Sequence, residues 1–122
     1  MNTYEIGTKY VALVKEGRRE ECLSTLFSHD AVSVEAAEFP GRERTVKGLD
    51  GLRAKSKFFL ENNEVHKLEV LGPYPNDDRF AVRFVMEVTF KPSGQRRAID
   101  EVGLFTVADG RITREEFFYS VG

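Results

Sequence analysis

The chain has 122 residues, 41% of them hydrophobic and 31% charged, which is typical of one globular domain with a buried core. Eighteen basic and twenty acidic residues leave a net charge of −2, so the sequence lacks the basic excess that a nucleic-acid-binding surface needs. The single cysteine, Cys22, excludes an internal disulfide and a cysteine-rich zinc site and indicates a reducing compartment. The amino terminus has no basic start followed by an apolar stretch, and no window is apolar enough to span a membrane. We therefore expect a single cytoplasmic domain over residues 1–122 that binds neither nucleic acid nor membrane.

Three helices are predicted in the first half of the chain. Asn2 begins the first helix, and apolar residues then recur on one face until Gly17 interrupts the pattern. A second, shorter helix is expected over residues 18–28. The third covers residues 48–61 and directs Phe59 inward.

Extended segments dominate the rest of the sequence. Residues 31–35 form a short β-branched run, with Val32 and Val34 on one face, and the turn-rich residues 38–48 that follow predict a loop. Four longer segments, separated by plausible turns, cover residues 65–71, 80–90, 97–107 and 111–121. Helices followed by long strands predict an α+β architecture with a meandering antiparallel sheet.

The strand expected over residues 80–90 shows how this sheet should be oriented. One face carries Val82, Phe84, Met86, Val88 and Phe90, and the other carries Arg83, Glu87 and Thr89. The apolar face should pack against the helices, whereas the polar face should meet solvent or a second subunit.

Four local strings identify the chain as similar to the SnoaL-like branch of the nuclear-transport-factor-2-like superfamily. They are KYVALVKEG, FSHDAVSVE, TVKGLDGL and VADGRITREEFFY. The resemblance implies a cone-shaped roll, in which three helices pack into a strongly curved sheet around an apolar pocket. It also implies a homodimer formed through the outer face of the sheet.

Ketosteroid isomerases are the best-understood relatives by this resemblance. Tyr10 falls where they have an oxyanion-binding tyrosine, although an apolar-face tyrosine at the edge of the core explains the same pattern. Ala36 falls where they have a general-base aspartate, and alanine cannot accept a proton. Glu35 points to the opposite face of the strand if the alternation holds. This departure argues against steroid isomerisation by the familiar route.

Glu101 is a candidate acid or base on the strand expected over residues 97–107. It lies two residues from Gly103, which matches the relatives' protonated aspartate, and shares a face with Phe105. A carboxylate among such apolar neighbours should have a raised pKa. Alternatively, Asp100 and Glu101 form a polar pair near the end of the strand that binds a basic side chain.

The last strand places a second carboxylate in the expected pocket. Glu115, Phe117 and Tyr119 share the face that lines the cavity in relatives. Two neighbouring carboxylates cannot both ionise cheaply, so one would donate a proton while the other accepts it. Alternatively, one of them pairs with an arginine.

The remaining charged groups give weaker signals. His66 lies near the start of a strand on the face of Leu68 and Val70, where it could reach the cavity rim or form a hydrogen bond as a partly buried histidine. No spaced histidine pair supports a metal site, so we predict no metal. Residues 42–57 carry six basic and two acidic side chains, which we expect mostly on a solvated face.

We therefore predict a small-molecule pocket, with a cofactor-independent isomerase, cyclase or dehydratase acting on a small apolar carbonyl compound. Glu101 or Glu115 would be the acid or base, and Tyr10 or Tyr119 would bind the oxyanion. The residues expected to contact the ligand are Phe59, His66, Phe105, Phe117 and Tyr119. The alternative is a protein that binds a small hydrophobic ligand without converting it, which the alanine at position 36 favours. No phosphate-binding loop or dinucleotide fingerprint is present, so we expect no cofactor.

Overall fold

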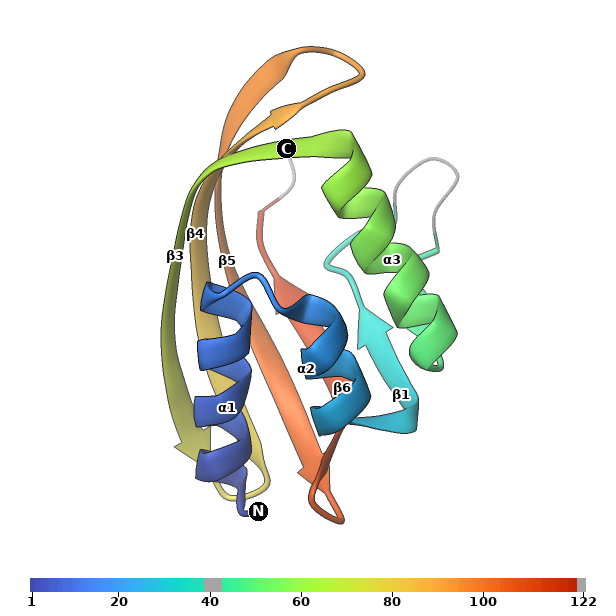
Figure 1. Ribbon diagram of the computed structural model, residues 1–122, viewed down its shortest axis with the longest axis vertical. Helices are drawn as coiled ribbons and strands as arrows, with labels where there is room; N and C mark the ends of the chain where they lie inside the picture. Colours follow the sequence, from blue (N-terminus) through green and yellow to red (C-terminus); the bar gives the residue numbers. More distant parts are fainter. Residues whose placement is uncertain (39–42, 121–122) are drawn as a thin grey trace.

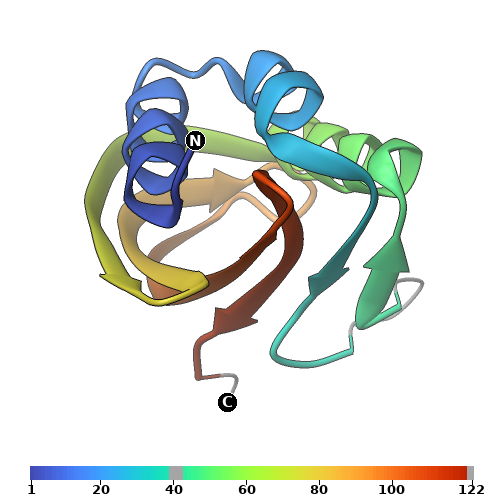
Figure 2. The same cartoon turned by 90° about the horizontal axis from the view of Figure 1, so that it is seen from below.

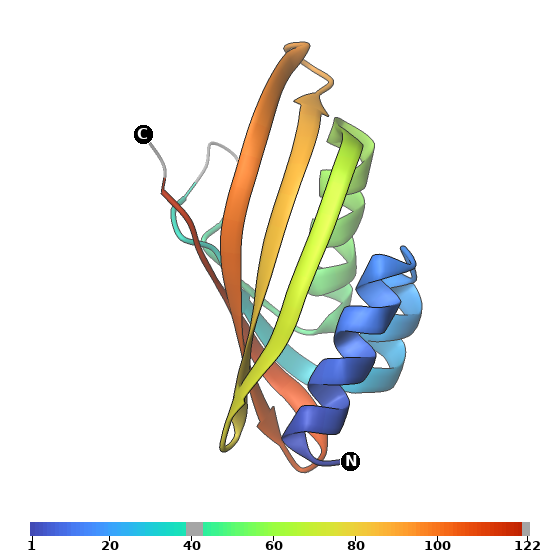
Figure 3. The same cartoon turned by 90° about the vertical axis from the view of Figure 1, so that its left-hand side faces the viewer.

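The structure is a computed structural model that describes residues 1–38 and 43–120. Three helices lie on the same side of a six-stranded sheet (Figures 1 and 3). The helices are α1 (Thr3–Lys15), α2 (Arg19–Leu26) and α3 (Leu49–Asn62). The strands are β1 (Phe27–Val34), β2 (Thr45–Lys47), β3 (Asn63–Asn76), β4 (Arg79–Phe90), β5 (Gln95–Ala108) and β6 (Arg111–Phe118).

The sheet has the strand order β2-β1-β6-β5-β4-β3 and curves strongly around the helices (Figure 2). This arrangement confirms the predicted α+β roll. The expectation of a fully antiparallel sheet is wrong for one pair, because β1 runs parallel to β6. The strand periodicity predicted both strands, but it carries no information on which distant strand pairs with which.

α1 begins as predicted and packs closely against the sheet. The Asn2 side chain accepts a hydrogen bond from the Glu5 amide at 2.8 Å, and the Glu5 carboxylate accepts one from the Asn2 amide at 3.0 Å. This capping box satisfies amides that lack partners in the first turn. A Cβ atom on Gly7 would lie 2.8 Å from the Pro73 Cβ atom. The glycine therefore allows α1 to approach β3 closely.

The predicted boundaries change most around β1. The second helix ends at Leu26 rather than residue 28, because Phe27 already pairs with Ile112 of β6. Part of the predicted loop over residues 38–48 is strand β2, which pairs with β1. Residues 39–42 of that loop, and residue 121 at the end of the last predicted strand, lie outside the described residues.

The two long hairpin strands are closer to expectation. β4 buries Val82, Phe84, Met86 and Val88 and exposes Arg83 and Glu87, as its alternation predicts. β3 is longer than predicted, since it continues through the proposed turn with a register shift between Leu71 and Tyr74.

An aromatic core joins α1 to the middle of the sheet. The Tyr10 ring lies 4.5 Å from that of Phe105, which in turn stacks on Phe80 at 4.8 Å. All three side chains are at most 2% exposed. No helix within residues 1–38 and 43–120 has the length and apolar character needed to cross a membrane.

Candidate functional site

A cavity of about 890 Å³ lies between α3 and the concave face of the sheet. Its volume is within the range of small-molecule pockets. Most of its wall is apolar, and the apolar side chains come mainly from α3 and from four strands. They include Phe58, Phe59, Leu60, Val65, Leu68, Phe84, Met86, Phe90, Ile99 and Phe117.

The floor of the cavity holds an ion pair. Glu115 of β6 is 1% exposed, and its Oε1 atom lies 3.4 Å from Nη2 of Arg19 at the start of α2. Arg19 also donates through Nη1 to the Tyr10 hydroxyl at 3.4 Å, and its guanidinium lies 5.5 Å from the centre of the Phe27 ring. Burial raises the pKa of Tyr10 above its usual range, so this hydroxyl keeps its proton.

A chain of short hydrogen bonds leads from this floor to the cavity wall. Glu115 Oε2 accepts from the Ser33 hydroxyl at 2.7 Å, and Ser33 accepts from Lys55 Nζ at 2.6 Å. Lys55, on α3, also pairs with Glu35 at 2.6 Å. The other Glu35 oxygen accepts from the Tyr119 hydroxyl at 2.6 Å. The chain thus joins two carboxylates, a cation and two hydroxyls.

Glu101 lies beside this chain but outside it. It lines the cavity on β5, directly opposite Phe84 of β4, and its side chain makes no hydrogen bond or ion pair with any described residue. Burial raises the pKa of its carboxyl to about 7, and the nearby negative charge of Glu35 adds to this effect while Lys55 opposes it. Glu101 is therefore a carboxyl group that can exchange a proton near neutral pH.

The amino-acid sequence carries the signature of one family along almost its whole length. The sequence model of the SnoaL-like domain matches residues 1–119. The chain belongs to the SnoaL-like family. A comparison with curated proteins gave no match.

Solved structures support the assignment of this chain to the SnoaL-like family. One from Mesorhizobium loti, named as a candidate SnoaL-like polyketide cyclase and also as a carbohydrate phosphatase, is 42% identical with a TM-score of 0.91. The alignment covers 98% of this chain and 100% of that one. Because that name carries two different activities, the similarity does not fix a reaction.

More distant structures share the fold. An NTF2-like protein from Burkholderia thailandensis is 16% identical with a TM-score of 0.83, over 97% of this chain and 90% of that one. A protein with a ketosteroid isomerase-like fold from Catenulispora acidiphila, in complex with trimethylamine, is 21% identical with a TM-score of 0.71. That alignment covers 98% of this chain and 88% of the Catenulispora acidiphila chain. At these identities the likeness extends to the architecture alone.

Six of the eight predicted site residues of the SnoaL-like protein line the cavity. They are Tyr10, Phe59, Glu101, Glu115, Phe117 and Tyr119. Glu101 shares its inward face with Gly103 and Phe105, as expected, whereas Asp100 faces outward and pairs with Arg83 at 2.8 Å. Of the two alternatives for Glu115, proton exchange with a neighbouring carboxylate or pairing with an arginine, the structure shows the pairing, with Arg19.

Two predicted ligand contacts lie elsewhere. A register shift between Val65 and Lys67 turns the His66 side chain away from the cavity, and its ring nitrogen Nε2 lies 2.6 Å from the Thr89 hydroxyl oxygen. Phe105 is completely buried in the aromatic core and does not line the cavity. The periodicity placed Phe105 on the correct face of β5, but it could not show that Tyr10 and Phe80 cover the ring.

Glu35 is the main correction to the predicted site. The sequence alternation placed Val32 and Val34 on one face of the strand and Glu35 on the opposite face from Ala36. In the structure Ala31 and Ser33 are completely buried and the two valines are only partly buried, so Glu35 follows Ser33 on the inward face. A shift of one residue exchanges the two faces of a strand. The SnoaL-like protein has Ala36 at the position of the relatives' general-base aspartate. The inward Glu35 therefore places a carboxylate next to that position.

Lys55 and Arg19 were not predicted as site residues. Lys55 belongs to the basic run that we expected to be mostly solvated, yet its side chain is only 12% exposed. The spacing of Leu52, Lys55 and Phe59 on α3 is the helical spacing of one face, and this signal could have found it. Arg19 follows Gly17 at the start of α2, where nothing in the sequence indicated a buried cation.

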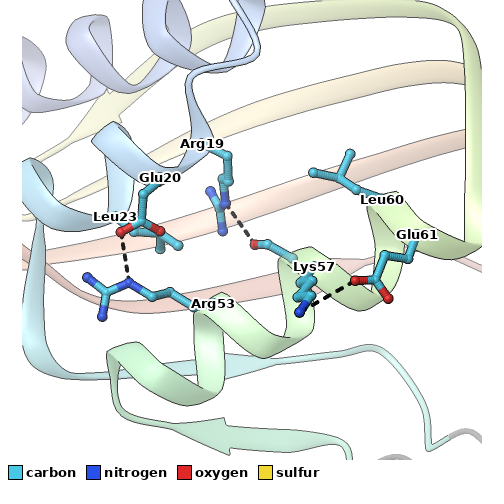
Figure 4. Close-up of a pocket in the computed structure, with 8 residues that line it drawn as sticks. Arg19, Glu20, Leu23, Arg53, Lys57, Leu60 and Glu61 are labelled. Carbon is cyan, nitrogen blue, oxygen red and sulfur yellow. Dashed lines mark hydrogen bonds and ion pairs between the residues drawn. The ribbon is translucent and has the colours of Figure 1, made fainter.

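Arg19 also separates the cavity from a smaller groove of about 320 Å³ between α2 and α3 (Figure 4). Its Nε atom donates to the Ser56 hydroxyl at 3.1 Å, and both residues line the groove and the cavity. The groove itself carries paired charges, such as Arg53 with Glu20 at 2.9 Å. Within the described residues, no group of three or more His, Cys, Asp or Glu side chains is arranged to hold a metal ion.

Proposed function

We propose that the cavity binds a small apolar carbonyl compound and moves a proton on it without a cofactor, as an isomerase, cyclase or dehydratase does. The observation that carries this proposal is Glu101. It combines a pKa of about 7 with an apolar cavity wall and with two hydrogen-bond donors nearby, Lys55 and Tyr119. A general acid or base works best when its pKa is close to the working pH.

The proton would be taken from the carbon next to the carbonyl group. Glu101, in its ionised form, accepts this proton, the electron pair of the C–H bond forms a C=C bond, and the π electron pair of the carbonyl moves to its oxygen to give an enolate. Where a C=C bond is conjugated with the enolate, returning the proton to the far carbon of that bond completes an isomerisation. Attack of the enolate carbon on a second carbonyl, with transfer of the proton from Glu101 to the new alkoxide oxygen, would complete a cyclisation. Neither sequence needs an oxidant, a reductant or a metal ion.

Lys55 is the group best suited to stabilise the enolate oxygen. An ammonium group has three N–H donors, and Lys55 directs two of them to Ser33 and Glu35. The third is left for a ligand, in a cavity where little water screens the charge. Tyr10, the tyrosine expected in this role, lies on the floor of the cavity, where its hydroxyl accepts a hydrogen bond from Arg19. Tyr119 now donates its hydroxyl hydrogen bond to Glu35. It would assist Lys55 if it donated this hydrogen bond to the ligand instead.

Deuterium exchange tests this proposal without knowledge of the natural substrate. Simple ketones such as cyclohexanone and decan-2-one are incubated with the protein in D₂O, and NMR follows loss of the α-protons. We expect the protein to accelerate exchange and Glu101→Gln to lower the rate by about 10²-fold or more. Glu87→Gln, on the outer face of β4, should keep the full rate.

Two results would contradict the proposal in different ways. Equal exchange by the wild type and Glu101→Gln would remove Glu101 from the reaction. Saturable binding of the ketones without any exchange would leave a binding protein and overturn the catalytic part.

We also infer that the outer face of the sheet forms a homodimer interface, as the family resemblance implies. Val102 and Phe118 are neighbours across β5 and β6 on this face, and they are 37% and 51% exposed. Burying such apolar area favours association. Light scattering at micromolar concentration should give twice the chain mass, and Phe118→Asp should lower it. A wild-type monomer would contradict the inference.

The cytoplasm remains our proposal for the location of the protein. Cys22 is completely buried on α2, and burial raises the pKa of its thiol to about 11. Such a thiol is a core side chain rather than a partner for a disulfide. Fractionation of cells that produce the native protein tests this proposal, and recovery from outside the cytoplasm would contradict it.

A further inference from the structure

We propose that the ligand is elongated and carries a carboxylate at the end opposite its carbonyl group, and that Arg97 binds this carboxylate. The inference rests on the proposed function of the same cavity and names the class of its ligand. Arg97 lines the cavity on β5, on the same face of the strand as Ile99 and Glu101. Four residues of a strand separate Arg97 from Glu101 by roughly 13 Å.

Arg97 differs from its neighbours because its charge is not compensated. No carboxylate of the described residues lies within 4.0 Å of its guanidinium, whereas Arg96 pairs with Glu87 at 3.8 Å and Arg83 pairs with Asp100 at 2.8 Å. Those pairs lie on the outer face of the sheet. A cation without a carboxylate on the cavity wall is the complement of an acidic ligand group.

The wall between Arg97 and Glu101 is apolar. Ile99 lies between them on β5 and pairs with Met86 of β4, which pairs in turn with Leu68 of β3. All three line the cavity. The cavity therefore offers a polar end at Lys55 and Glu101, an apolar middle and a cationic end at Arg97. A molecule with a carbonyl group, a hydrocarbon chain and an acid, in that order, fits this sequence of surfaces.

The charge of the β4–β5 hairpin supports an anion rather than a neutral polar group. Lys91, Arg96 and Arg97 all lie at this end of the sheet, and the carboxylates there, Glu87 paired with Arg96 and Glu64 opposite Thr89, lie on its outer face. The hairpin projects beyond the three helices (Figure 1), so this positive end is accessible to an approaching ligand. One guanidinium fork matches one carboxylate, whereas a phosphate dianion would need more than the single cation found on the wall here.

Binding of a matched pair of ligands tests the inference. The probes are 9-oxodecanoate, which has a ketone and a carboxylate at opposite ends, and decan-2-one, which has the same chain length and ketone but no acid. Isothermal titration calorimetry is carried out on wild type, Arg97→Gln and Arg96→Gln. Because both variants remove one positive charge from the same hairpin, Arg96→Gln controls for long-range electrostatics.

We expect wild type to bind 9-oxodecanoate about fivefold more tightly than decan-2-one, as suits one partly solvated ion pair. Arg97→Gln should abolish this preference, and Arg96→Gln should keep it. Equal binding of the two probes by wild type, or an unchanged preference in Arg97→Gln, would overturn the inference while the pocket proposal stands. Failure of wild type to bind either probe would overturn both.

Discussion

The floor and the wall of the cavity each hold a glutamate, and the two glutamates differ in their hydrogen-bond and ion-pair partners. On the floor, Glu115 is almost completely buried, yet it has Arg19 and Ser33 as partners. On the wall, Glu101 is less buried and has no partner among the described residues, and its pKa is raised to about 7. Burial without a hydrogen-bond or ion-pair partner, as at Glu101, makes a carboxyl group available for proton exchange near neutral pH.

This contrast separates a structural role from a chemical one. A buried carboxylate with a cation and a hydroxyl donor is compensated where it lies, and losing either partner should destabilise the fold. A carboxyl group without partners costs stability when it ionises, and that cost is what makes it a usable acid or base near neutrality. Changes at the floor should therefore alter stability, and changes at the wall should alter pH dependence.

Removal of the floor cation is expected to have the largest effect. Arg19→Met leaves Glu115 as a buried carboxylate without its cation, which should lower the free energy of unfolding by about 3 kcal/mol at pH 7. Urea denaturation measures this change. Arg53→Met removes exposed pairs with Glu20 and Asp50 and should lower the free energy of unfolding much less. Equal losses in the two variants would show that the floor pair is no more important than a surface pair.

Glu101 should make the free energy of unfolding depend on pH, and this effect should be smaller than that of Arg19→Met. Its folded pKa of about 7 lies above its ordinary value of 4.5. Between these values the unfolded chain loses this proton and the folded chain keeps it, so the contribution of Glu101 to stability falls as pH rises through this window. It is fully present below pH 4.5 and lost above pH 7.

Glu101→Gln removes this dependence. The stability of the variant relative to wild type should rise by on the order of 2 kcal/mol from pH 4.5 to pH 7.5 and then stay constant. Urea denaturation at several pH values gives the difference directly. A difference that does not change across this range would mean that Glu101 titrates alike in the folded and unfolded chains.

The smallest expected effects come from the charges that surround Glu101. Glu35→Gln removes a negative charge and should lower the pKa of Glu101, whereas Lys55→Met removes a positive charge and should raise it. Carboxyl-detected NMR titration of each variant gives the sign. Shifts in the same direction for both variants would contradict an electrostatic origin.

The sequence predicted the fold well because most of its strands follow a simple rule. In β4 the apolar side chains alternate with charged ones, and the apolar set is buried. The same rule failed in β1, where Val32 and Val34 alternate with Ser33 and the polar residue is the buried one. Ser33 lies inside because Lys55 and Glu115 form hydrogen bonds with it there, and both come from distant parts of the chain.

The site was predictable to the extent that it follows strand periodicity. The alternation of β5 and β6, together with the resemblance to the family, placed four residues on the cavity face: Glu101, Glu115, Phe117 and Tyr119. The partners of these residues could not be predicted in the same way, because hydrogen bonds between α3, β1 and β6 depend on how the elements pack. Periodicity gives the face of a residue but not its neighbours.

Glu101 should titrate near neutral pH if it is the acid or base of the cavity. The most direct measurement is a carboxyl ¹³C NMR titration of the wild-type protein, with the Glu101 signal assigned from its absence in Glu101→Gln. We expect a midpoint near pH 7. A midpoint near the ordinary value of 4.5 would contradict it, because Glu101 would then carry a full charge at neutral pH.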